Sequence, residues 1–599
     1  MPVTIKKHPE GYAVKITGDK VEFKANLEKV KGIPGRKWDP TAKVWVLMDD
    51  INTLMRAVEE LHPELSAEVR DEVRGAQEQV ADDLVTQVGS DSQNLLVPWA
   101  DGLRPFQRSG VDFAVNHRNI LWADDMGLGK TVQSITAVEE FYLRRVMEED
   151  GPAGSGMMAG SNTSARPGPG PVLVICPNSA RGSVDHEGGW WAEITRGPNP
   201  KYFDRSTWPE LEATIVDGST PKKRKQQIRD AVDDNEYVII NWEKLRLHPE
   251  LKDYKWAAII ADEAHRAKNP RAKQTKALHR LKAPIKFALT GTPIMNSPDE
   301  LWSPLHWLYP DAYSNYYRFD SMFVEGYKGF KGKKIVTGVR NPDALRFELS
   351  DKMIRRPKMQ VLDDFPEQRH ARELELEMGA KQRRAYLAAE NEFVLDVELA
   401  MSDPEYRADN VEPEDILAAL KSGDKDRLKF LIPNAGARLS RMRQIATSPA
   451  LLDEGFEDES VKMDYVQERI NDHPGKSFVV ACHHKAATET FAARLRKQKP
   501  AISCAVMNGD VPAKDRAAMV EAFQSGEAQV FIATIAVAST AITLTASDTV
   551  FFLEEDWVPA NNRQMEDRVW RIGQESPVSV IRVRSADTVA TNDIAPAHR

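Results

Sequence analysis

Short apolar runs recur from about residue 96 to residue 306, and residues with helical spacing separate them. The runs are NILWAD (119–124), PVLVICP (171–177), EYVIINW (236–242), WAAIIADE (256–263) and IKFALTGT (285–292). Continuous apolar runs that alternate with helices are typical of a parallel sheet whose two faces are both covered. The pattern therefore predicts a first α/β lobe over 96–306.

The same alternation returns at residue 441 and predicts a second α/β lobe over 441–590, followed by a tail over 591–599. Its apolar runs are KSFVVACHH (476–484), AQVFIAT (528–534), DTVFFLEE (548–555) and VSVIRVRS (578–585). Residues 307–440 are aromatic and charged, without a comparable series of runs. This composition predicts a mostly helical insertion between the two lobes.

The first 64 residues follow a separate pattern. YAVKIT (12–17) alternates apolar and polar residues, VWVLM (44–48) follows an Asp-Pro turn signal, and INTLMRAVEEL (51–61) has helical spacing. We therefore expect a small α+β module over 1–64. The polar residues 65–95 fit a connecting helix or linker.

The N-terminal module also carries an excess of basic residues. Its first 48 residues hold ten Lys and Arg against five Asp and Glu, and Arg36, Lys37 and Trp38 are adjacent. A cation beside an aromatic ring suits a phosphate next to an unstacked base. These three residues are candidate nucleic-acid contacts.

The composition of the 599-residue chain excludes several classes of protein. Apolar residues make up 41% and charged residues 29%, which is inconsistent with a collagen-like or wholly disordered chain. No apolar stretch approaches 18 residues and no secretory leader is apparent, so we expect no membrane partner. Three scattered cysteines favour a reduced, cytoplasmic protein. The net charge of −9 means that local basic surfaces must hold any nucleic acid.

The string DDMGLGKT (124–131) ends an apolar run and opens a helical pattern, which is the context of a phosphate-binding loop. The two glycines let backbone N–H groups turn toward a polyphosphate, and the helix N-terminus favours negative charge. Lys130 is expected to reach the β- and γ-phosphates, and the Thr131 hydroxyl to bind magnesium. The predicted ATP-binding loop comprises Asp125, Met126, Gly127, Leu128, Gly129, Lys130 and Thr131.

Two further motifs carry catalytic candidates. DEAH (262–265) ends an apolar run, so Asp262 can hold magnesium and Glu263 can position the attacking water. Arg568 and Arg571 are three residues apart, and we expect them to share one helical face. From the second lobe they are natural arginine fingers for a nucleotide that is bound on the first. The adjacent Trp190 and Trp191 are expected to be packing anchors.

The motifs, in the order in which they occur along the chain, resemble those of the Swi/Snf-type ATPases. These ATPases are a branch of helicase superfamily two with two RecA-like lobes. The resemblance covers about residues 96–590, and DEAHRAKN (262–269) and DRVWRIGQ (567–574) are its most specific strings. The other similar segments include LRPFQRSGVDF (103–113), VLVICPNSA (172–180), IINWEKLR (239–246), ALTGTPIMNSPDELW (288–302), MIRRPKMQVLDDFP (353–366) and TLTASDTVFFLEEDWVPA (543–560).

The resemblance implies an ATP-dependent motor on double-stranded or forked DNA, with ATP and magnesium as cofactors. It also implies ATP contacts from Arg104, Gln107 and Gln564, and nucleic-acid contacts from Thr290 and Thr292. Residues 32–58 are similar to the HepA-related domain found beside such motors in annealing helicases. No chromatin-reading motif is apparent, which favours a bacterial or phage-infected cytoplasm.

Three functions remain open. The first is strand reannealing or fork remodelling, which the N-terminal module favours. The second is ATP-driven removal of proteins, such as RNA polymerase, from DNA. The third is a non-catalytic, DNA-bound scaffold with a decayed motor.

Departures from the family pattern bear on this third function. Asp124 stands where the phosphate-loop pattern has its first glycine, and Ser539 and Ala541 stand where motif V usually has glycines. Replacing a glycine removes backbone freedom. The intact lysine, acidic pair and arginines of the other motifs argue against decay.

Overall fold

The chain divides into two compact units, residues 1–363 and 364–599. A computed structural model describes all residues except 1–2, 34–35, 90, 93, 151–169, 184–187, 201–202, 296, 329–333, 363–365, 367–369, 403–415, 417–434, 453–458, 513–514, 539–541 and 589–599. The predicted tail and the motif V positions Ser539 and Ala541 therefore lie outside the described residues.

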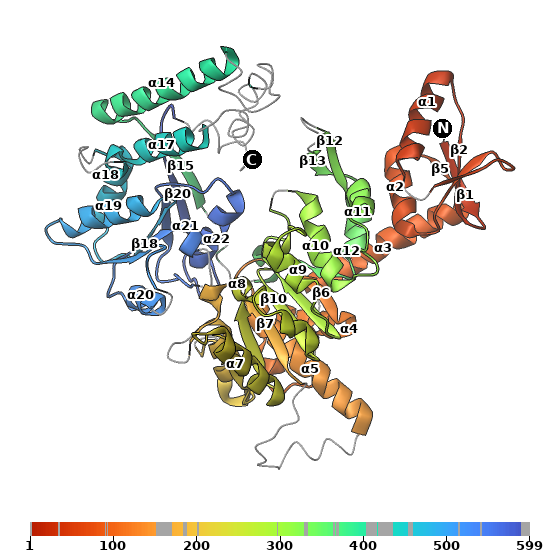
Figure 1. The fold of residues 1–599 in the computed structure, drawn as a ribbon, viewed down its shortest axis with the longest axis horizontal. Coiled ribbons are helices and arrows are strands. Elements are labelled where there is room, and N and C mark those ends of the chain that lie inside the picture. The colour runs from red at the N-terminus through yellow and green to blue at the C-terminus, as the bar shows by residue number, and fades with distance from the viewer. Residues whose placement is uncertain are drawn as a thin grey trace. The chain divides into compact units, whose positions relative to one another are not determined.

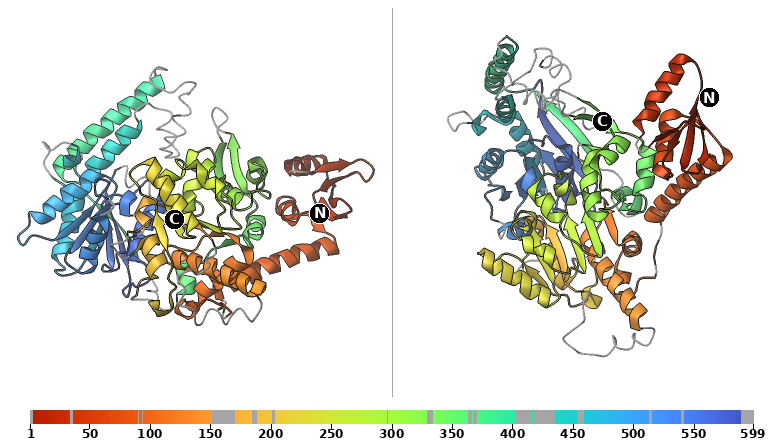
Figure 2. Two further views of the ribbon diagram at one scale, coloured as in Figure 1. Left: turned by 60° about the horizontal axis from the view of Figure 1, so that its bottom comes forward. Right: turned by 45° about the vertical axis from the view of Figure 1, so that its right-hand side comes forward.

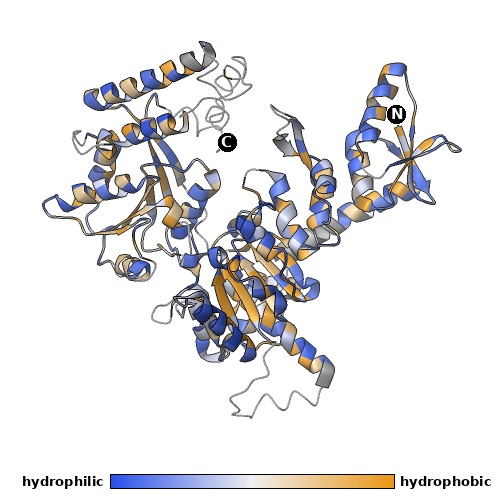
Figure 3. Ribbon diagram, in the orientation of Figure 1, coloured by the Kyte–Doolittle hydropathy of each residue, from blue (hydrophilic) through white to orange (hydrophobic). Residues whose placement is uncertain are grey.

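The first unit contains a fully parallel sheet in the order β14-β6-β11-β10-β7-β9-β8 (Figure 1). Its strands are β6 (Asn119–Trp122), β7 (Val172–Cys176), β8 (Ala213–Ile215), β9 (Tyr237–Asn241), β10 (Ala258–Asp262), β11 (Ile285–Leu289) and β14 (Met353–Ile354). Leu173 and Ile175 pack into the apolar cluster on one face of this sheet, and Val172 and Val174 into the cluster on the other. Because both faces are covered, the strands are predominantly apolar along their length, as the colours of Figure 3 show.

Helices separate the strands of this first lobe. They are α4 (Pro105–His117), α5 (Lys130–Asp150), α6 (Gly189–Arg196), α7 (Pro221–Asp233), α8 (Trp242–Leu245), α9 (Lys273–Leu278) and α10 (Trp302–Leu308). Each of the five strands expected from the apolar runs of this lobe is confirmed.

The second unit contains a second fully parallel sheet in the order β15-β20-β19-β16-β18-β17. Its strands are β15 (His370–Leu376), β16 (Phe478–Cys482), β17 (Cys504–Met507), β18 (Val530–Thr534), β19 (Thr549–Phe552) and β20 (Ser579–Ser585). Its helices are α14 (Ala380–Ser402), α17 (Ala435–Thr447), α18 (Val461–Asn471), α19 (Lys485–Arg496), α20 (Arg516–Gln524), α21 (Ile535–Ala538) and α22 (Pro559–Val569). The predicted α/β fold with two RecA-like lobes is thus confirmed.

The N-terminal module is a small α+β unit. Its sheet has the order β3-β4-β2-β1-β5, in which β5 pairs parallel to β1 and the other pairs are antiparallel. The strands are β1 (Val3–His8), β2 (Gly11–Ile16), β3 (Lys37–Asp39), β4 (Val44–Leu47) and β5 (Glu64–Leu65), with helices α1 (Lys20–Gly32) and α2 (Ile51–Leu61). The long helix α3 (Ala67–Gly89) leads from the module toward the first lobe (Figure 2).

The module packs against α12 (Pro342–Leu349) of the same unit. The backbone N–H of Asp343 at the start of α12 donates to Glu59 Oε1 of α2 at 3.0 Å. Leu54 of α2 and Leu345 of α12 belong to one buried apolar cluster. The module is therefore joined to the rest of the first unit by a packed interface as well as by the chain.

The segment 307–440 differs from the predicted insertion, because two of its pieces are strands of the lobe sheets. β14 pairs with β6 in the first sheet, and β15 pairs with β20 in the second. Its other described elements include α11 (Tyr316–Phe323), the hairpin β12 (Val324–Lys328) and β13 (Lys334–Val339), α12, α13 (Lys358–Val361), α14 and the start of α17. None of the described helices is long and apolar enough to cross a membrane.

Candidate nucleotide site

The predicted phosphate loop connects β6 to α5, which begins at Lys130. Gly127 has a φ of +83° and Gly129 a φ of +75°, a backbone region that favours glycine. A Cβ atom on Gly129 would lie 2.5 Å from Gln107 Nε2. The loop therefore needs glycine at position 129 both for its turn and for the close approach of α4.

Gln107 ties the start of α4 to this loop. Its Oε1 accepts from the backbone N–H of Arg104 at 3.0 Å, and its Nε2 donates to the carbonyl of Leu128 at 3.2 Å. Gln107 is buried, whereas Arg104 is exposed. The structure thus places the predicted ATP contact Gln107 against the loop, and the backbone of Arg104 next to Gln107.

The predicted cation lies beside both predicted carboxylates. Lys130 Nζ donates to the carbonyls of Asp124 at 2.6 Å and Asp125 at 3.1 Å. Burial lowers the pKa of Lys130, against the opposing effect of nearby carboxylates that include Glu263 and Asp262. The loop, its lysine and the acidic pair at the end of β10 thus form one site at the carboxyl edge of the sheet.

Two hydrogen bonds hold the Asp262 carboxylate. Its Oδ2 accepts from Trp190 Nε1 at 2.9 Å, and its Oδ1 accepts from the backbone N–H of Glu263 at 2.9 Å. Burial, and next the charge of Glu263, raise the pKa of Asp262 to about 6. The indole N–H of Trp190 thus positions an acidic residue of the site, in addition to the packing role that the sequence predicts.

Glu263 has φ +51° and ψ +49°, the left-handed region that a residue with a side chain rarely adopts. Such a conformation costs about 1–3 kcal/mol and is found mainly at functional sites. His265 Nδ1 lies 3.2 Å from Glu263 Oε2 and 3.2 Å from Thr290 Oγ1. His265 therefore connects the acidic motif to the end of β11.

The predicted nucleic-acid contacts Thr290 and Thr292 lie at that strand end. Thr290 is only 2% exposed, and its Oγ1 also accepts from the backbone N–H of Thr292 at 3.1 Å. This burial leaves Thr290 little surface to offer a nucleic acid.

Asp124 has a specific partner, the fully buried Arg356. Arg356 Nε donates to Asp124 Oδ1 at 2.9 Å and Nη2 to Asp124 Oδ2 at 2.5 Å, while both side chains are 0% exposed. The same guanidinium donates to Gln133 Oε1 of α5 at 2.9 Å and to the carbonyl of Phe106 in α4. Removing one partner of a buried ion pair costs about 3–5 kcal/mol. Asp124, which stands where the loop pattern has its first glycine, thus ties the phosphate loop to Arg356 in the segment that follows β14.

The residues predicted to bind magnesium fit that ion chemically. Mg²⁺ prefers hard oxygen ligands, usually one or two carboxylates together with substrate phosphates, rather than a complete cage of side chains. Thr131 offers a hydroxyl and Asp262 a carboxylate whose pKa is raised by burial and next by the charge of Glu263. Within the described residues no group of three acidic, histidine or cysteine side chains could hold a metal alone. This donor set matches a nucleotide-bound magnesium.

The raised pKa of Asp262 predicts a pH-dependent effect of its removal. Above about pH 6 the folded protein keeps a charged, buried carboxylate, which disfavours folding relative to the solvated carboxylate of the unfolded chain. We expect Asp262→Asn, without nucleotide or metal, to raise the thermal unfolding midpoint at about pH 8 and to lose this gain as the pH falls from about 6 toward the ordinary aspartate value of 3.8. Thermal unfolding measured across this range is the test, with exposed Asp253→Asn as the control. A gain independent of pH would contradict it.

In the second lobe, α22 and the turn after it carry the predicted arginines. The expectation that Arg568 and Arg571 share a helical face is wrong, because α22 ends at Val569 and Trp570 leaves the helical conformation with ψ +75°. Gly573, with φ +98°, turns the chain directly afterwards. Arg568 is therefore in the last helical turn, and Arg571 lies in the turn that follows.

Both arginines adjoin the segment that follows motif V. The carbonyl of Arg568 accepts from the backbone N–H of Leu544 at 2.8 Å, and Arg571 Nη1 donates to the carbonyl of Ile542 at 3.3 Å. The predicted ATP contact Gln564 is buried on α22, and its Nε2 has no hydrogen-bond partner among the described residues.

Buried ion pairs hold α22 on its sheet. Glu566 pairs with Arg582 of β20, and Arg582 Nε also lies 2.9 Å from Glu555 Oε1. Gln574 Nε2 donates to the carbonyl of Ser547 at 2.8 Å. The contacts of Glu566 and Gln574 thus fix the chain before Arg568 and after Arg571.

The three candidates of the N-terminal module lie at its edge strand β3. Trp38 is 49% exposed and its ring centroid lies 5.2 Å from that of Trp45, which packs against the core. Arg36 Nη1 donates to the carbonyl of Ile33 at 3.0 Å, and Lys37 Nζ lies 3.6 Å from Glu10 Oε2 in an exposed ion pair. The structure therefore leaves an aromatic face and two cations together on the surface.

Sequence comparison matches a SNF2-related domain to residues 44–429, which is more than half of the chain, and a helicase conserved C-terminal domain to residues 461–573. The chain belongs to the SNF2-related family. It carries both domains of a DNA-dependent ATPase of helicase superfamily two. The first match contains the phosphate loop and the acidic pair, and the second contains α22 and its arginines.

Among related proteins, the TATA-binding protein-associated factor mot1 of Aspergillus fumigatus is 26% identical over 521 residues, which are 81% of this SNF2-related chain and 26% of the relative. This chain therefore spans about a quarter of that relative's length. A SWI/SNF-related matrix-associated actin-dependent regulator of chromatin subfamily A-like protein 1 homolog of Caenorhabditis elegans is 25% identical, over 99% of this chain and 76% of the relative. A solved Sulfolobus solfataricus SWI2/SNF2 ATPase core in complex with dsDNA is 23% identical, covering 83% of this chain and 91% of its own, with a TM-score of 0.35.

Proposed function

We propose that this protein is an ATP-driven translocase on double-stranded or forked DNA, with magnesium as the partner of ATP. The observation that supports it is the meeting of Lys130, Asp262 and Glu263 beside the glycine loop at one sheet edge. Lys130 would neutralise phosphate charge, Thr131 and Asp262 would hold magnesium, and Glu263 would orient the attacking water. The arginines of the second lobe would stabilise transition-state charge on lobe closure.

Strand reannealing or fork remodelling, in DNA repair or replication, is the DNA transaction that we propose. The exposed Trp38 beside Arg36 and Lys37 supports it, because a stacking surface with adjacent cations suits the unpaired bases at a fork. The similarity to the Caenorhabditis elegans relative extends over 99% of this chain, so it includes the N-terminal module. We propose that this module is the HepA-related domain that the sequence resembles.

Point substitutions test this role better than deletion, because removing α2 would uncover the buried Ala344 and Leu345 of α12. We expect Trp38→Ala with Lys37→Gln to weaken fork binding by about 5- to 150-fold, the loss of one stacked base, and to affect plain duplex less. The measurement is the affinity for forked and duplex DNA together with the rate of strand reannealing.

The same module offers a matched control. Phe23→Ala with Lys24→Gln also removes an exposed aromatic residue and a neighbouring cation, but on α1. It should change fork binding little. Equal losses on fork and duplex, or no loss on either, would contradict the fork-directing role of β3.

Removal of proteins from DNA is the second candidate. The Aspergillus fumigatus relative is named as a factor associated with the TATA-binding protein, which favours this alternative. This second candidate function predicts that ATP hydrolysis releases a protein bound on duplex DNA. It also predicts that activity on forked DNA does not depend on Trp38.

A further inference from the structure

Asp262, the acidic residue that ends β10, accepts hydrogen bonds from two tryptophans on opposite faces of the first sheet. Trp190 Nε1 donates to the carboxylate at Oδ2 over 2.9 Å, and Trp242 Nε1 donates to the backbone carbonyl over 2.8 Å. Both tryptophan side chains are buried, Trp190 in the apolar cluster on one face of the sheet and Trp242 in the cluster on the other. We call these two residues the indole pair.

The local sequence places each member of the pair. Trp190 is in the first turn of α6, which begins at Gly189 with a φ of +81°. A Cβ atom on Gly189 would lie 2.5 Å from the backbone nitrogen of Gly182, so this approach of two segments requires glycine. Trp242 begins α8 directly after β9, where the side chain of Asn241 caps the helix. The chain thus brings one indole to Asp262 from a helix on each face of the sheet.

The chemistry of the donors distinguishes Asp262 from Asp124, the other buried carboxylate described above. The guanidinium of Arg356 pairs with Asp124 and balances its charge. The carboxylate of Asp262 instead accepts from an indole and from the backbone N–H of Glu263, and both donors are neutral. An indole N–H can only donate and carries no charge. It therefore orients the carboxylate and leaves the negative charge for a cation.

The cation that this carboxylate would hold is the magnesium ion that accompanies ATP. Lys130 is nearby, but its Nζ donates to the carbonyls of Asp124 and Asp125 at 2.6 and 3.1 Å. Residues that hydrogen-bond a metal ligand fix its orientation, and replacing one typically costs about 10- to 100-fold in metal affinity or activity. The indole pair occupies that place around Asp262.

We propose that Trp190 and Trp242 are positioning residues for magnesium, and that Trp190 sets the affinity of the nucleotide site for this ion. The proposal rests on the ATP- and magnesium-dependent function proposed above and deepens it. Both residues act through Asp262, because their N–H groups donate to it. Without the N–H of Trp190, the carboxylate loses the side-chain donor that orients it, and magnesium binding should weaken while nucleotide binding itself persists.

The test is the binding of mant-ADP, a fluorescent ADP analogue, to the full-length protein without DNA, in EDTA and over a series of magnesium concentrations. Trp190→Phe keeps an aromatic ring and removes the N–H. We expect it to raise the magnesium concentration for half-maximal enhancement of binding by about 10- to 100-fold, with unchanged affinity in EDTA. Trp242→Phe should raise it less, because this N–H holds the backbone of Asp262 and not the carboxylate.

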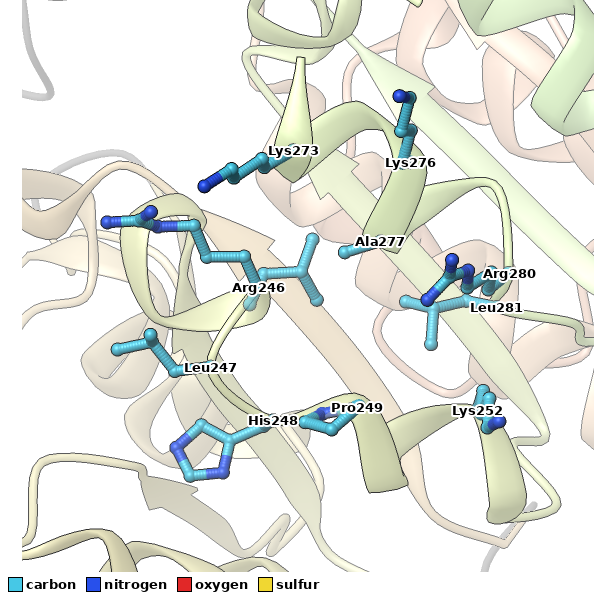
Figure 4. A pocket seen from close by; sticks show the side chains of 11 residues that line it. Arg246, Leu247, His248, Pro249, Lys252, Lys273, Lys276, Ala277, Arg280 and Leu281 are labelled. Carbon is cyan, nitrogen blue, oxygen red and sulfur yellow. The ribbon is translucent and has the colours of Figure 1, made fainter. Parts of the chain in front are cut away.

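The neighbouring Trp191 is a matched control, because its Nε1 donates to the carbonyl of Ala213 at 2.9 Å. Trp191→Phe should leave the magnesium requirement unchanged. Leu247→Ala is the control for Trp242, since Leu247 follows α8, is 54% exposed and lines the surface pocket shown in Figure 4. Thermal unfolding in EDTA checks that each variant is folded. If Trp190→Phe does not fold, an unchanged magnesium requirement in Trp242→Phe overturns the proposal.

Two results would assign the indole pair to packing and overturn the proposal. One is an equal rise of the magnesium requirement in Trp190→Phe and Trp191→Phe. The other is a loss of affinity in EDTA as large as the loss with magnesium. If the unmodified protein binds mant-ADP no better with magnesium than in EDTA, the proposed nucleotide function fails as well. Magnesium-enhanced binding by the unmodified protein, with no change in any variant, removes the role of the indole pair alone.

Discussion

Replacing Lys130 with alanine is expected to abolish ATP turnover, lowering it by about 10³-fold or more. Lys130 is the only cation of the loop 123–131, all of which is described, and it lies beside both acidic residues of the site. Without it, no side chain of the loop balances the charge of the β- and γ-phosphates. Steady-state phosphate release by the purified, folded variant is the measurement.

The same site predicts a different result for Glu263→Gln. This variant should bind ATP but fail to hydrolyse it, because the carboxylate that orients water is lost while the magnesium ligand Asp262 remains. Glu243→Gln, which alters an exposed glutamate paired with Arg266, is the matched control and should retain turnover. Near-normal hydrolysis by folded Lys130→Ala or Glu263→Gln would show that the site is assigned incorrectly.

Substitution of the α22 arginines has the second largest expected effect. An arginine supplied from another element contributes about 10³-fold or more to phosphoryl transfer, so Arg571→Gln and Arg568→Lys should each reduce turnover on this scale. ATP affinity should stay nearly intact, because these residues act on the transition state. The measurement pairs turnover with nucleotide binding in each variant.

Arg563→Gln is the control for this pair, since Arg563 is exposed on the same helix. The change to Lys at Arg568 preserves charge and bulk at a position that is only 5% exposed. A loss of ATP binding equal to the loss of turnover would assign the two arginines to the ground-state pocket and contradict their role on lobe closure.

The interior of each lobe was predictable from the sequence, whereas its edges were not. Each apolar run that was read as a strand became one, and the strands that were missed, β8, β14, β15 and β17, are the outer strands of the two sheets. An outer strand has one solvated edge, so it is often short or alternates with polar residues, as HARELEL does in β15. Its hydrophobic pattern is correspondingly weak.

The nucleotide site likewise contains residues that could be predicted from the sequence and residues that could not. Lys130, Asp262 and Glu263 lie in local motifs with recognisable spacing, so they were predictable. Trp190 and Arg356 were not assigned to the site, because their partners Asp262 and Asp124 are 72 and 232 residues away in the chain. Such pairs leave no local periodicity, although a carboxylate at the glycine position of the loop was a sign that a counter-ion was needed.

The end of α22 shows a limit of periodicity itself. Spacing of three residues predicted one helical face for the two arginines, but the helix ends between them, at Val569 and the non-helical Trp570, and Gly573 turns the chain after Arg571. A helix boundary is decided by a few local residues, and the spacing of side chains does not mark it.

The most direct test of the translocase function is the rate of ATP hydrolysis measured in parallel without nucleic acid and with single-stranded, duplex and forked DNA. Glu263→Gln provides the background in each condition. We expect duplex and forked DNA to raise the rate well above the rate without nucleic acid, with forked DNA at least as effective as duplex. Hydrolysis at the same rate in all four conditions, or at the rate of Glu263→Gln throughout, would contradict it.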